Sequence, residues 1–323
     1  MTERLDIINF LRGFSIFSIV LTHLMQFHNF PMLINKAINF GSSGIHVFIL
    51  CSGFGLYLSY LHKPLTYRQF IKRRFSKIYF PYIIIVLLSA LWEFYLSGFF
   101  NWKIVFSHIF LYKMFVPEYE CSLGGPFWFI STIIQFYIAW PLLVKIAKMK
   151  WGLLLGFIVS YSWATLVVIL GYENERVWTC FFLQFLWEFL LGMWLAEKYF
   201  TNKQQYFNIK WKYIISGIFI GIPLTALTGL SFLRLYNDIL ALTGFLSVTL
   251  FIYKMNISFI NKFFNYTNNI SYELFLCHML VYSIIKYLVN EKNPTVIEDI
   301  LCFTIAYTYA YLYNIMLKRC KIK

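Results

Sequence analysis

The chain has 323 residues, of which 60 % are hydrophobic, 22 % are aromatic and only 13 % are charged. About a quarter of the residues in an average soluble domain are charged, so this composition excludes an ordinary soluble protein and indicates an integral membrane protein. The formal net charge of +14 does not indicate nucleic-acid binding, because basic residues concentrate in the loops that a membrane protein keeps inside the cell.

Apolar runs of about 17 to 25 residues, the length that a helix needs to cross a bilayer, recur along the whole sequence. They predict an all-α, polytopic membrane helical bundle of about ten transmembrane helices, at 8–28, 43–61, 78–98, 127–146, 152–171, 178–197, 212–230, 235–253, 271–290 and 298–317. The run from Trp102 to Phe115 is shorter and is typical of a re-entrant or interfacial segment. No repeat or linker interrupts the pattern, so residues 1–323 are expected to form a single integral-membrane domain.

The basic residues predict the orientation of this bundle. With both termini in the cytoplasm, 20 of the 28 lysines and arginines lie in inside segments and six lie outside. Arg12 and Lys286 fall within spans. Because lysine and arginine favour the cytoplasmic side, both termini are predicted to be cytoplasmic.

Arg12 and His23 stand inside the first apolar run, where ionisable groups are costly and usually functional. Eleven residues on an α-helix correspond to about 1100° of rotation, within roughly 20° of full turns, and to a rise of about 16 Å. The two side chains are therefore expected to line one cavity, with an anion held near Arg12 and chemistry performed at His23.

A basic cluster, Lys72 to Lys77, leads into the third predicted span. Arg74 and Lys77 are three residues apart at the expected start of a helix, so they share a face where, together with Arg73, they can bind phosphate. The alternative is a loop that contacts anionic lipid headgroups without a specific ligand.

Other polar residues in the predicted spans each leave two interpretations open. Ser52 lies among small residues that serve either helix packing or substrate binding. His46, near the outer surface, pairs with a ligand or donates to a neighbouring carbonyl. Trp128 is typical of an aromatic belt, and Gln135 needs a partner on another helix or in a polar cavity. His278 is either a second functional histidine or a satisfied core residue.

Acidic residues and cysteines give weaker signals. Glu93, Glu188 and Asp238 are expected to pair with Arg12 or another polar group, or to be protonated. The six cysteines contain no CxxC pair, so no metal or redox centre is expected. Cys121 and Cys180, both predicted outside, form a disulfide or remain free thiols.

Five motifs in one order carry a family resemblance. Arg12 and His23 form R-x10-H, residues 44–54 resemble G-V-x-x-F-F-x-x-S-G-F, and residues 74–81 resemble R-x-x-R-I-x-P. Residues 128–141 are similar to a stretch with W followed by Q-F-Y and P, and residues 271–278 to S-Y-x-x-Y-L-x-H. The chain thus resembles the acyltransferase 3 family of membrane-bound O-acyltransferases of bacterial cell envelopes. Lys77 departs from the family's second arginine, which keeps the charge but loses bidentate phosphate geometry.

The resemblance implies a multi-pass enzyme of the bacterial plasma membrane. It would move an acyl group, commonly acetyl, from cytoplasmic acetyl-CoA or another acyl-CoA to a hydroxyl of an envelope polysaccharide or a lipid-linked sugar. Besides this donor, the expected partners are the carbohydrate acceptor and membrane lipids. No nucleic acid and no permanently bound cofactor or metal are expected. The alternative is a transporter or flippase for a lipid-linked sugar, with Arg12, His23 and Glu188 lining a pathway for an anion or proton.

The resemblance also assigns expected roles to residues. His23 acts as a general base or accepts the acyl group transiently, and Arg12 contacts the donor or orients His23 through an intermediate group. Arg73, Arg74 and Lys77 hold the donor phosphates. The expected substrate-binding residues are His46, Ser52, Trp128, Gln135, Tyr137 and His278.

Overall fold

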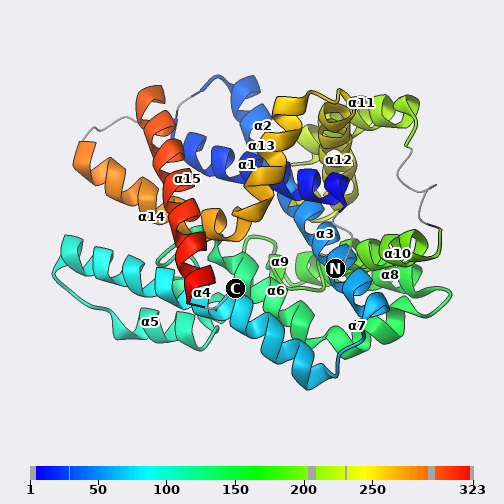
Figure 1. Ribbon diagram of the computed structural model, residues 1–323, viewed down its shortest axis with the longest axis horizontal. Coiled ribbons are helices and arrows are strands. Elements are labelled where there is room, and N and C mark those ends of the chain that lie inside the picture. The colour runs from blue at the N-terminus through cyan, green and yellow to red at the C-terminus, as the bar shows by residue number, and fades with distance from the viewer. Residues whose placement is uncertain (1–4, 29, 203–208, 230, 290–294, 321–323) are drawn as a thin grey trace. The chain divides into compact units, whose positions relative to one another are not determined.

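The computed structural model describes residues 5–28, 30–202, 209–229, 231–289 and 295–320, and among these residues all regular elements are helical (Figure 1). Within these described ranges, seven helices are long and apolar enough to cross a membrane, or up to eight if the bent pair Gly125–Ile138 and Trp140–Ala147 forms one span. The predicted all-α membrane bundle is therefore confirmed. Five basic residues that were used to predict the orientation lie outside the described residues, namely Arg4, Lys203, Lys292, Lys321 and Lys323. The last residues of the spans predicted at 212–230 and 271–290 also lie outside them.

The number of spans stays a prediction. Two of the ten predicted runs correspond to α10 (Leu186–Thr201, 16 residues) and α12 (Asp238–Lys254, 17 residues). At 1.5 Å per residue these helices are about 24 to 26 Å long, which is less than the roughly 30 Å of a hydrocarbon core.

The chain divides into two compact units that alternate along the sequence. The first unit comprises residues 1–65, 141–170 and 183–271, and the second comprises residues 66–140, 171–182 and 272–323. Each unit is thus assembled from three separate stretches of sequence.

In the first unit, α3 packs against both α1 and α10, α1 also contacts α13, and α11 lies beside α12 (Figure 1). Besides α10 and α12, and most of α7 (Trp140–Ala147), its α-helices are α1 (Asp6–Met25), α2 (Met32–Phe40), α3 (Gly44–His62), α8 (Gly152–Ile169), α11 (Trp211–Thr228) and α13 (Ser258–Asn269).

Two glycines allow α3 and α10 to approach closely. A Cβ atom on Gly53 would lie 2.2 Å from the carbonyl oxygen of Phe189, and one on Gly192 would lie 2.1 Å from that of Leu50. No side chain fits at such distances, so each glycine admits the backbone of the facing helix. Gly53 therefore serves helix packing, as one of the two interpretations of the small residues around Ser52 predicts.

The second unit is built on α4, a helix of 31 residues (Tyr67–Ser97) that is about 47 Å long at 1.5 Å per residue. Thr66 and Gln69 form a capping box at its start, and Gly98 ends it with a φ of 69°. The other α-helices of this unit are α5 (Trp102–Ile109), α6 (Trp128–Ile138), α9 (Arg176–Thr179), α14 (Ser271–Val289, except its first residue) and α15 (Val296–Arg319).

Pro81 lies inside α4, where a proline removes one helical hydrogen bond and loosens the turn before it. Two tyrosine hydroxyls donate to carbonyl oxygens at this place, Tyr272 to Ile78 in the turn before the proline at 2.7 Å and Tyr313 to Pro81 itself at 2.8 Å. These bonds attach α14 and α15 to α4.

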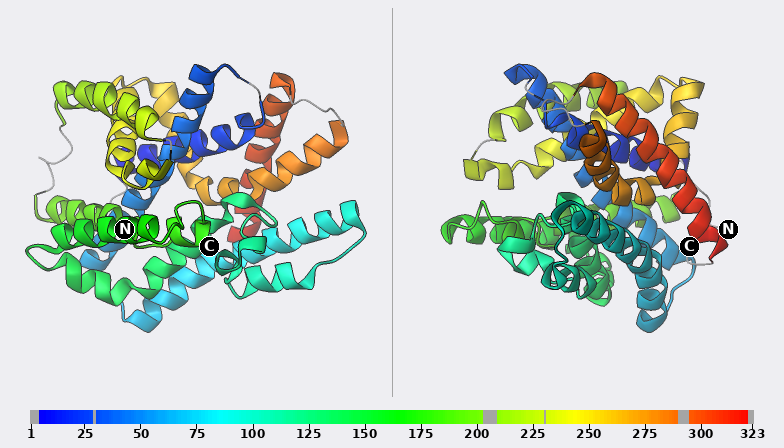
Figure 2. Two further views of the ribbon diagram at one scale, coloured as in Figure 1. Left: turned by 180° about the vertical axis from the view of Figure 1, so that it is seen from behind. Right: turned by 90° about the vertical axis from the view of Figure 1, so that its left-hand side faces the viewer.

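The predicted short segment after the third span is α5 followed by the 3-10 helix η2 (Lys113–Phe115). α5 packs along α4 (Figure 2) and, with eight residues, is too short to cross a bilayer. This agrees with a re-entrant or interfacial segment.

Candidate functional site

Arg12 and His23 belong to one unbroken helix, α1, and both are half-buried. Because the helix is continuous, the two side chains leave it on nearly the same face. The Arg12 guanidinium lies over the Phe48 ring of α3, 5.1 Å from its centroid. Its Nε atom is buried and has no hydrogen-bond partner among the described residues. A buried donor of this kind is costly unless an acceptor from a ligand or water completes it.

His46 of α3 lies between two buried carboxylates. Its Nδ1 atom donates to Oε1 of Glu188 on α10 at 2.7 Å, and its Nε2 atom is 4.0 Å from Oδ1 of Asp238, the first residue of α12. All three residues are at most 9 % exposed. The sequence therefore predicted correctly that Glu188 pairs with a polar group, and that group is His46.

Gln184 completes this cluster. Its Nε2 atom donates to Oδ2 of Asp238 and to the carbonyl oxygen of Leu235, both at 2.8 Å. Since both partners are acceptors, the amide orientation is fixed, and its Oε1 atom is left buried without a donor among the described residues. The second Glu188 oxygen, Oε2, is also buried without a hydrogen-bond partner there.

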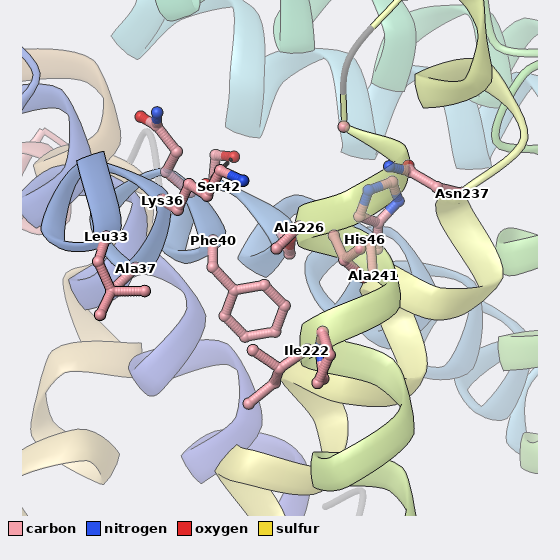
Figure 3. Close-up of a pocket in the computed structure, with 15 residues that line it drawn as sticks. Leu33, Lys36, Ala37, Phe40, Ser42, His46, Ile222, Ala226, Asn237 and Ala241 are labelled. Atoms are coloured by element: carbon pink, nitrogen blue, oxygen red, sulfur yellow. Dashed lines mark hydrogen bonds between the residues drawn. The ribbon is translucent and has the colours of Figure 1, made fainter.

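A cavity of about 740 Å³ reaches this cluster. His46 and Asn237 lie together at one end of it, and Leu33 and Ala37 of α2 lie at the other (Figure 3). Most of its wall is apolar and is formed by α2, α11 and α12, with polar groups near the start of α3. The cavity thus has mostly apolar walls, with His46 at one end and Lys36 near the other (Figure 3).

Arg73, Arg74 and Lys77 occupy a different position from the one predicted. The sequence placed Arg74 and Lys77 at a helix start, but α4 begins at Tyr67, so they lie in its second and third turns. The capping box at Thr66 extends the helix N-terminally through the basic cluster. The free amides of a helix N-terminus are therefore not available to a phosphate bound by these residues, although Arg74 and Lys77 do share a face.

Gln135 of α6 binds a backbone group. Its Oε1 atom accepts a hydrogen bond from the Phe182 amide at 3.1 Å, and the neighbouring Thr132 donates to the Cys180 carbonyl at 2.6 Å. These bonds hold the irregular segment after α9. The partner that a mid-span amide requires is thus supplied by the protein itself.

The remaining predicted substrate residues lie in both units. Ser52 donates to the Phe48 carbonyl within α3 at 2.8 Å, and Trp128, the first residue of α6, is half-buried. Tyr137 packs edge-on against Phe70, with ring centroids 5.8 Å apart. His278 is buried and its Nδ1 atom donates to the Leu274 carbonyl at 3.1 Å.

The structure groups Arg12, His23, His46 and Ser52 in the first unit. The second unit contains the other predicted site residues, which are Arg73, Arg74, Lys77, Trp128, Gln135, Tyr137 and His278. The association of His46 with Asp238 and Gln184 was missed by sequence reasoning. The available signal was the position of Glu188 and Asp238 inside apolar runs, because buried acids require partners.

Comparison with known families gives one match over nearly the whole chain. A family model described as an acyltransferase domain matches residues 5–315. Together with the apolar helices, this match defines the class of the protein as a multi-pass membrane acyltransferase. The chain belongs to the acyltransferase 3 family. No curated protein and no solved structure matches it.

Proposed function

We propose that the protein transfers an acyl group, most simply acetyl, from cytoplasmic acyl-CoA to a hydroxyl of a cell-envelope polysaccharide or lipid-linked sugar in the bacterial plasma membrane. The observation that carries this proposal is the placement of Arg12 and His23 on nearly the same face of the unbroken helix α1 in a chain of an acyltransferase family. Arg12 presents a buried donor, Nε, without a partner in the described chain, which suits an anionic or carbonyl group of a substrate.

In the proposed reaction, His23 removes the proton from the acceptor hydroxyl while the hydroxyl oxygen attacks the thioester carbonyl. The new C–O bond forms, the C–S bond breaks, and the departing CoA sulfur takes up the proton that the imidazole received. The alternative route transfers the acyl group first to the imidazole nitrogen and then to the acceptor. Arg12 contacts the donor or orients His23 in both routes.

The donor is proposed to be held through its phosphates by Arg73, Arg74 and Lys77, whose side chains lie on successive turns of α4. For the acceptor, the cavity that ends at His46 supplies a polar group at the end of an apolar chamber. This arrangement suits a molecule with a lipid part and a hydroxyl-bearing part.

The test is transfer of label from acetyl-CoA to envelope carbohydrate in membranes that contain the wild type, His23→Ala or His62→Ala. His62 is an exposed histidine at the end of α3 and serves as the matched control. Label is expected with the wild type and with His62→Ala, and is expected to be lost with His23→Ala at equal protein abundance.

Undiminished transfer by His23→Ala would overturn the role of His23 and leave the enzyme activity in place. Absence of transfer from every short acyl-CoA, with abundant folded wild-type protein, would overturn the acyl-CoA proposal itself.

A further inference from the structure

The cluster at the His46 end of the cavity offers a ligand set of which the acyl-transfer proposal uses only His46. His46, Glu188 and Asp238 each provide one ligand atom, and these three atoms lie within 4.8 Å of one another. We propose that His46, Glu188 and Asp238 bind a divalent transition-metal ion at this end of the cavity.

The distances fit an ion between the side chains. Nε2 of His46 and Oδ1 of Asp238 are 4.0 Å apart, which is too long for a hydrogen bond. Zinc lies about 2.0 to 2.2 Å from histidine nitrogen and carboxylate oxygen, so two ligands of one tetrahedral ion are roughly 3.3 to 3.6 Å apart. The 4.0 Å separation is about half an ångström longer, a difference that small side-chain rotations close, and the unpartnered Oε2 of Glu188 is the third available ligand.

The charges in the cluster also call for a cation. If both carboxylates are ionised, a protonated His46 leaves one net negative charge and a neutral His46 leaves two. Such a charge is costly in a buried site. A divalent ion with a neutral imidazole brings the sum to zero, and metal ions in proteins bind histidine in this neutral form.

Unsatisfied acceptors provide an independent observation. Oε2 of Glu188 and Oε1 of Gln184 are both buried without a hydrogen-bond donor among the described residues, and their side chains are 0 % and 3 % exposed. Buried acceptors are nearly always satisfied by a donor, a water or an ion. Two such oxygens beside one histidine and one aspartate are what a bound cation would satisfy.

The donor types indicate which ions are accepted. Imidazole with carboxylates suits zinc or manganese, whereas magnesium and calcium prefer all-oxygen sites. Three protein ligands leave coordination positions open, and His46 lines the cavity. A ligand in the cavity could therefore reach the ion through an oxygen atom. The cysteine-based expectation of no metal centre did not consider this set of residues.

The test uses the full chain, purified in detergent with an affinity tag that contains no histidine and stripped of metal with a chelator. Zn²⁺ binding is measured by calorimetry and elemental analysis, and Mn²⁺ binding by electron paramagnetic resonance. We expect one ion per wild-type chain and at least tenfold weaker binding by Glu188→Gln and by Asp238→Asn.

Glu273→Gln and His62→Asn are the matched controls, because they remove a buried carboxylate and an imidazole outside the cluster. Both are expected to bind as the wild type does. Size-exclusion profiles identify variants that fail to fold, and His46→Gln then replaces such a variant. In addition, Zn²⁺ is expected to raise the unfolding midpoint of the wild type and not that of His46→Gln.

Failure of the wild type to bind one ion, or equal binding by correctly folded Glu188→Gln and Asp238→Asn, would overturn the proposal. Because these measurements need no acyl-CoA, their failure would leave the acyl-transfer proposal untouched. Loss of label transfer in His23→Ala would likewise leave the metal site untouched.

Discussion

Arg74 and Lys77 lie within α4 rather than at its start, so any phosphate bound there depends on their side chains alone. A hydrogen bond to a charged group contributes about 1.5 to 3 kcal/mol, which corresponds to roughly a 10- to 100-fold change in affinity. We expect Arg74→Ala to raise the KM for acetyl-CoA by this factor with little change in kcat, because the phosphates do not react.

Lys77→Arg is expected to lower that KM, since a guanidinium binds phosphate through two hydrogen bonds. Initial rates at varied acetyl-CoA concentration measure both effects. Arg68→Ala, which removes an exposed cation from the first turn of the same helix, is the control and should leave KM unchanged. An equal rise in Arg68→Ala would show that only the general positive charge of α4 matters.

The sequence predicts the surroundings of some site residues better than those of others. The shared face of Arg12 and His23 depends only on helix geometry, which is local and regular. The bond between His46 and Glu188 joins residues 142 positions apart, and no local pattern contains that information. Gln135 is an intermediate case. Its position within an apolar run predicted that it needs a partner, but the sequence did not indicate that this partner is the Phe182 amide.

At the scale of helices, the contact between α3 and α10 gives a stability prediction. Gly53→Ala places a methyl group where the Phe189 carbonyl lies, so the helices must separate, at a cost of about 1 to 3 kcal/mol for overpacking. We expect a lower unfolding midpoint in detergent, measured by the fluorescence of buried tryptophans.

Gly55→Ala is the matched control on the same helix, because a Cβ atom there would meet nothing within 4 Å. Alanine favours a helix over glycine by about 0.5 to 1 kcal/mol, so this variant should be as stable as the wild type or more so. A lower midpoint for Gly55→Ala than for Gly53→Ala would contradict the assigned contact.

His108 of α5 gives a prediction for pH. Its Nδ1 atom lies 2.7 Å from the Tyr82 hydroxyl and its Nε2 atom donates to Ser122 Oγ at 3.0 Å, and a neutral ring satisfies both bonds with Nδ1 as the acceptor. Burial, together with the charge of Lys113, lowers the pKa of His108 from 6.5 to about 3. Because the unfolded state binds the proton more readily between pH 3 and 6.5, stability is full above pH 6.5 and falls as the pH drops below it.

The measurement is the unfolding midpoint of the wild type and of His108→Gln between pH 7.5 and 4.5. Glutamine removes the titrating group, so the decline below pH 6.5 should be smaller in the variant. Parallel pH profiles for the two proteins would show that other groups cause the acid sensitivity.

The existence and approximate position of the long helices were easier to predict than their boundaries. The apolar runs gave the position of most long helices, because the bilayer requires a fixed apolar length. The start of α4 was missed by eleven residues, since its first turns are basic and their helicity comes from the cap at Thr66. The 65° bend between α6 and α7 and the short α13 also went unpredicted, because neither alters the apolar content over a full span.

At the scale of the whole molecule, the native cysteines allow a test of orientation. Cys121 and Cys320 are exposed, whereas Cys51, Cys277 and Cys302 are buried. All six cysteines are free thiols, so Cys121 and Cys180 are not joined. With both termini in the cytoplasm, a membrane-impermeant maleimide should label Cys121 in intact spheroplasts and Cys320 only in inverted vesicles.

Cys121→Ser and Cys320→Ser identify the source of each signal in this experiment. Labelling of both cysteines from the same side would contradict the predicted topology. The count of spans would then have to change by an odd number between residues 121 and 320.

The alternation of the two units along the sequence has a consequence for biosynthesis. His46 enters the membrane with α3, but its partner Glu188 follows 142 residues later. At about 5 to 20 residues per second, the ribosome needs roughly 7 to 30 s to produce that partner. During this interval the nascent chain holds a polar imidazole and the glycine surface of α3 without α10 to cover them. An insertase or chaperone that shelters early helices would therefore have to cover this surface of α3 until α10 has been made.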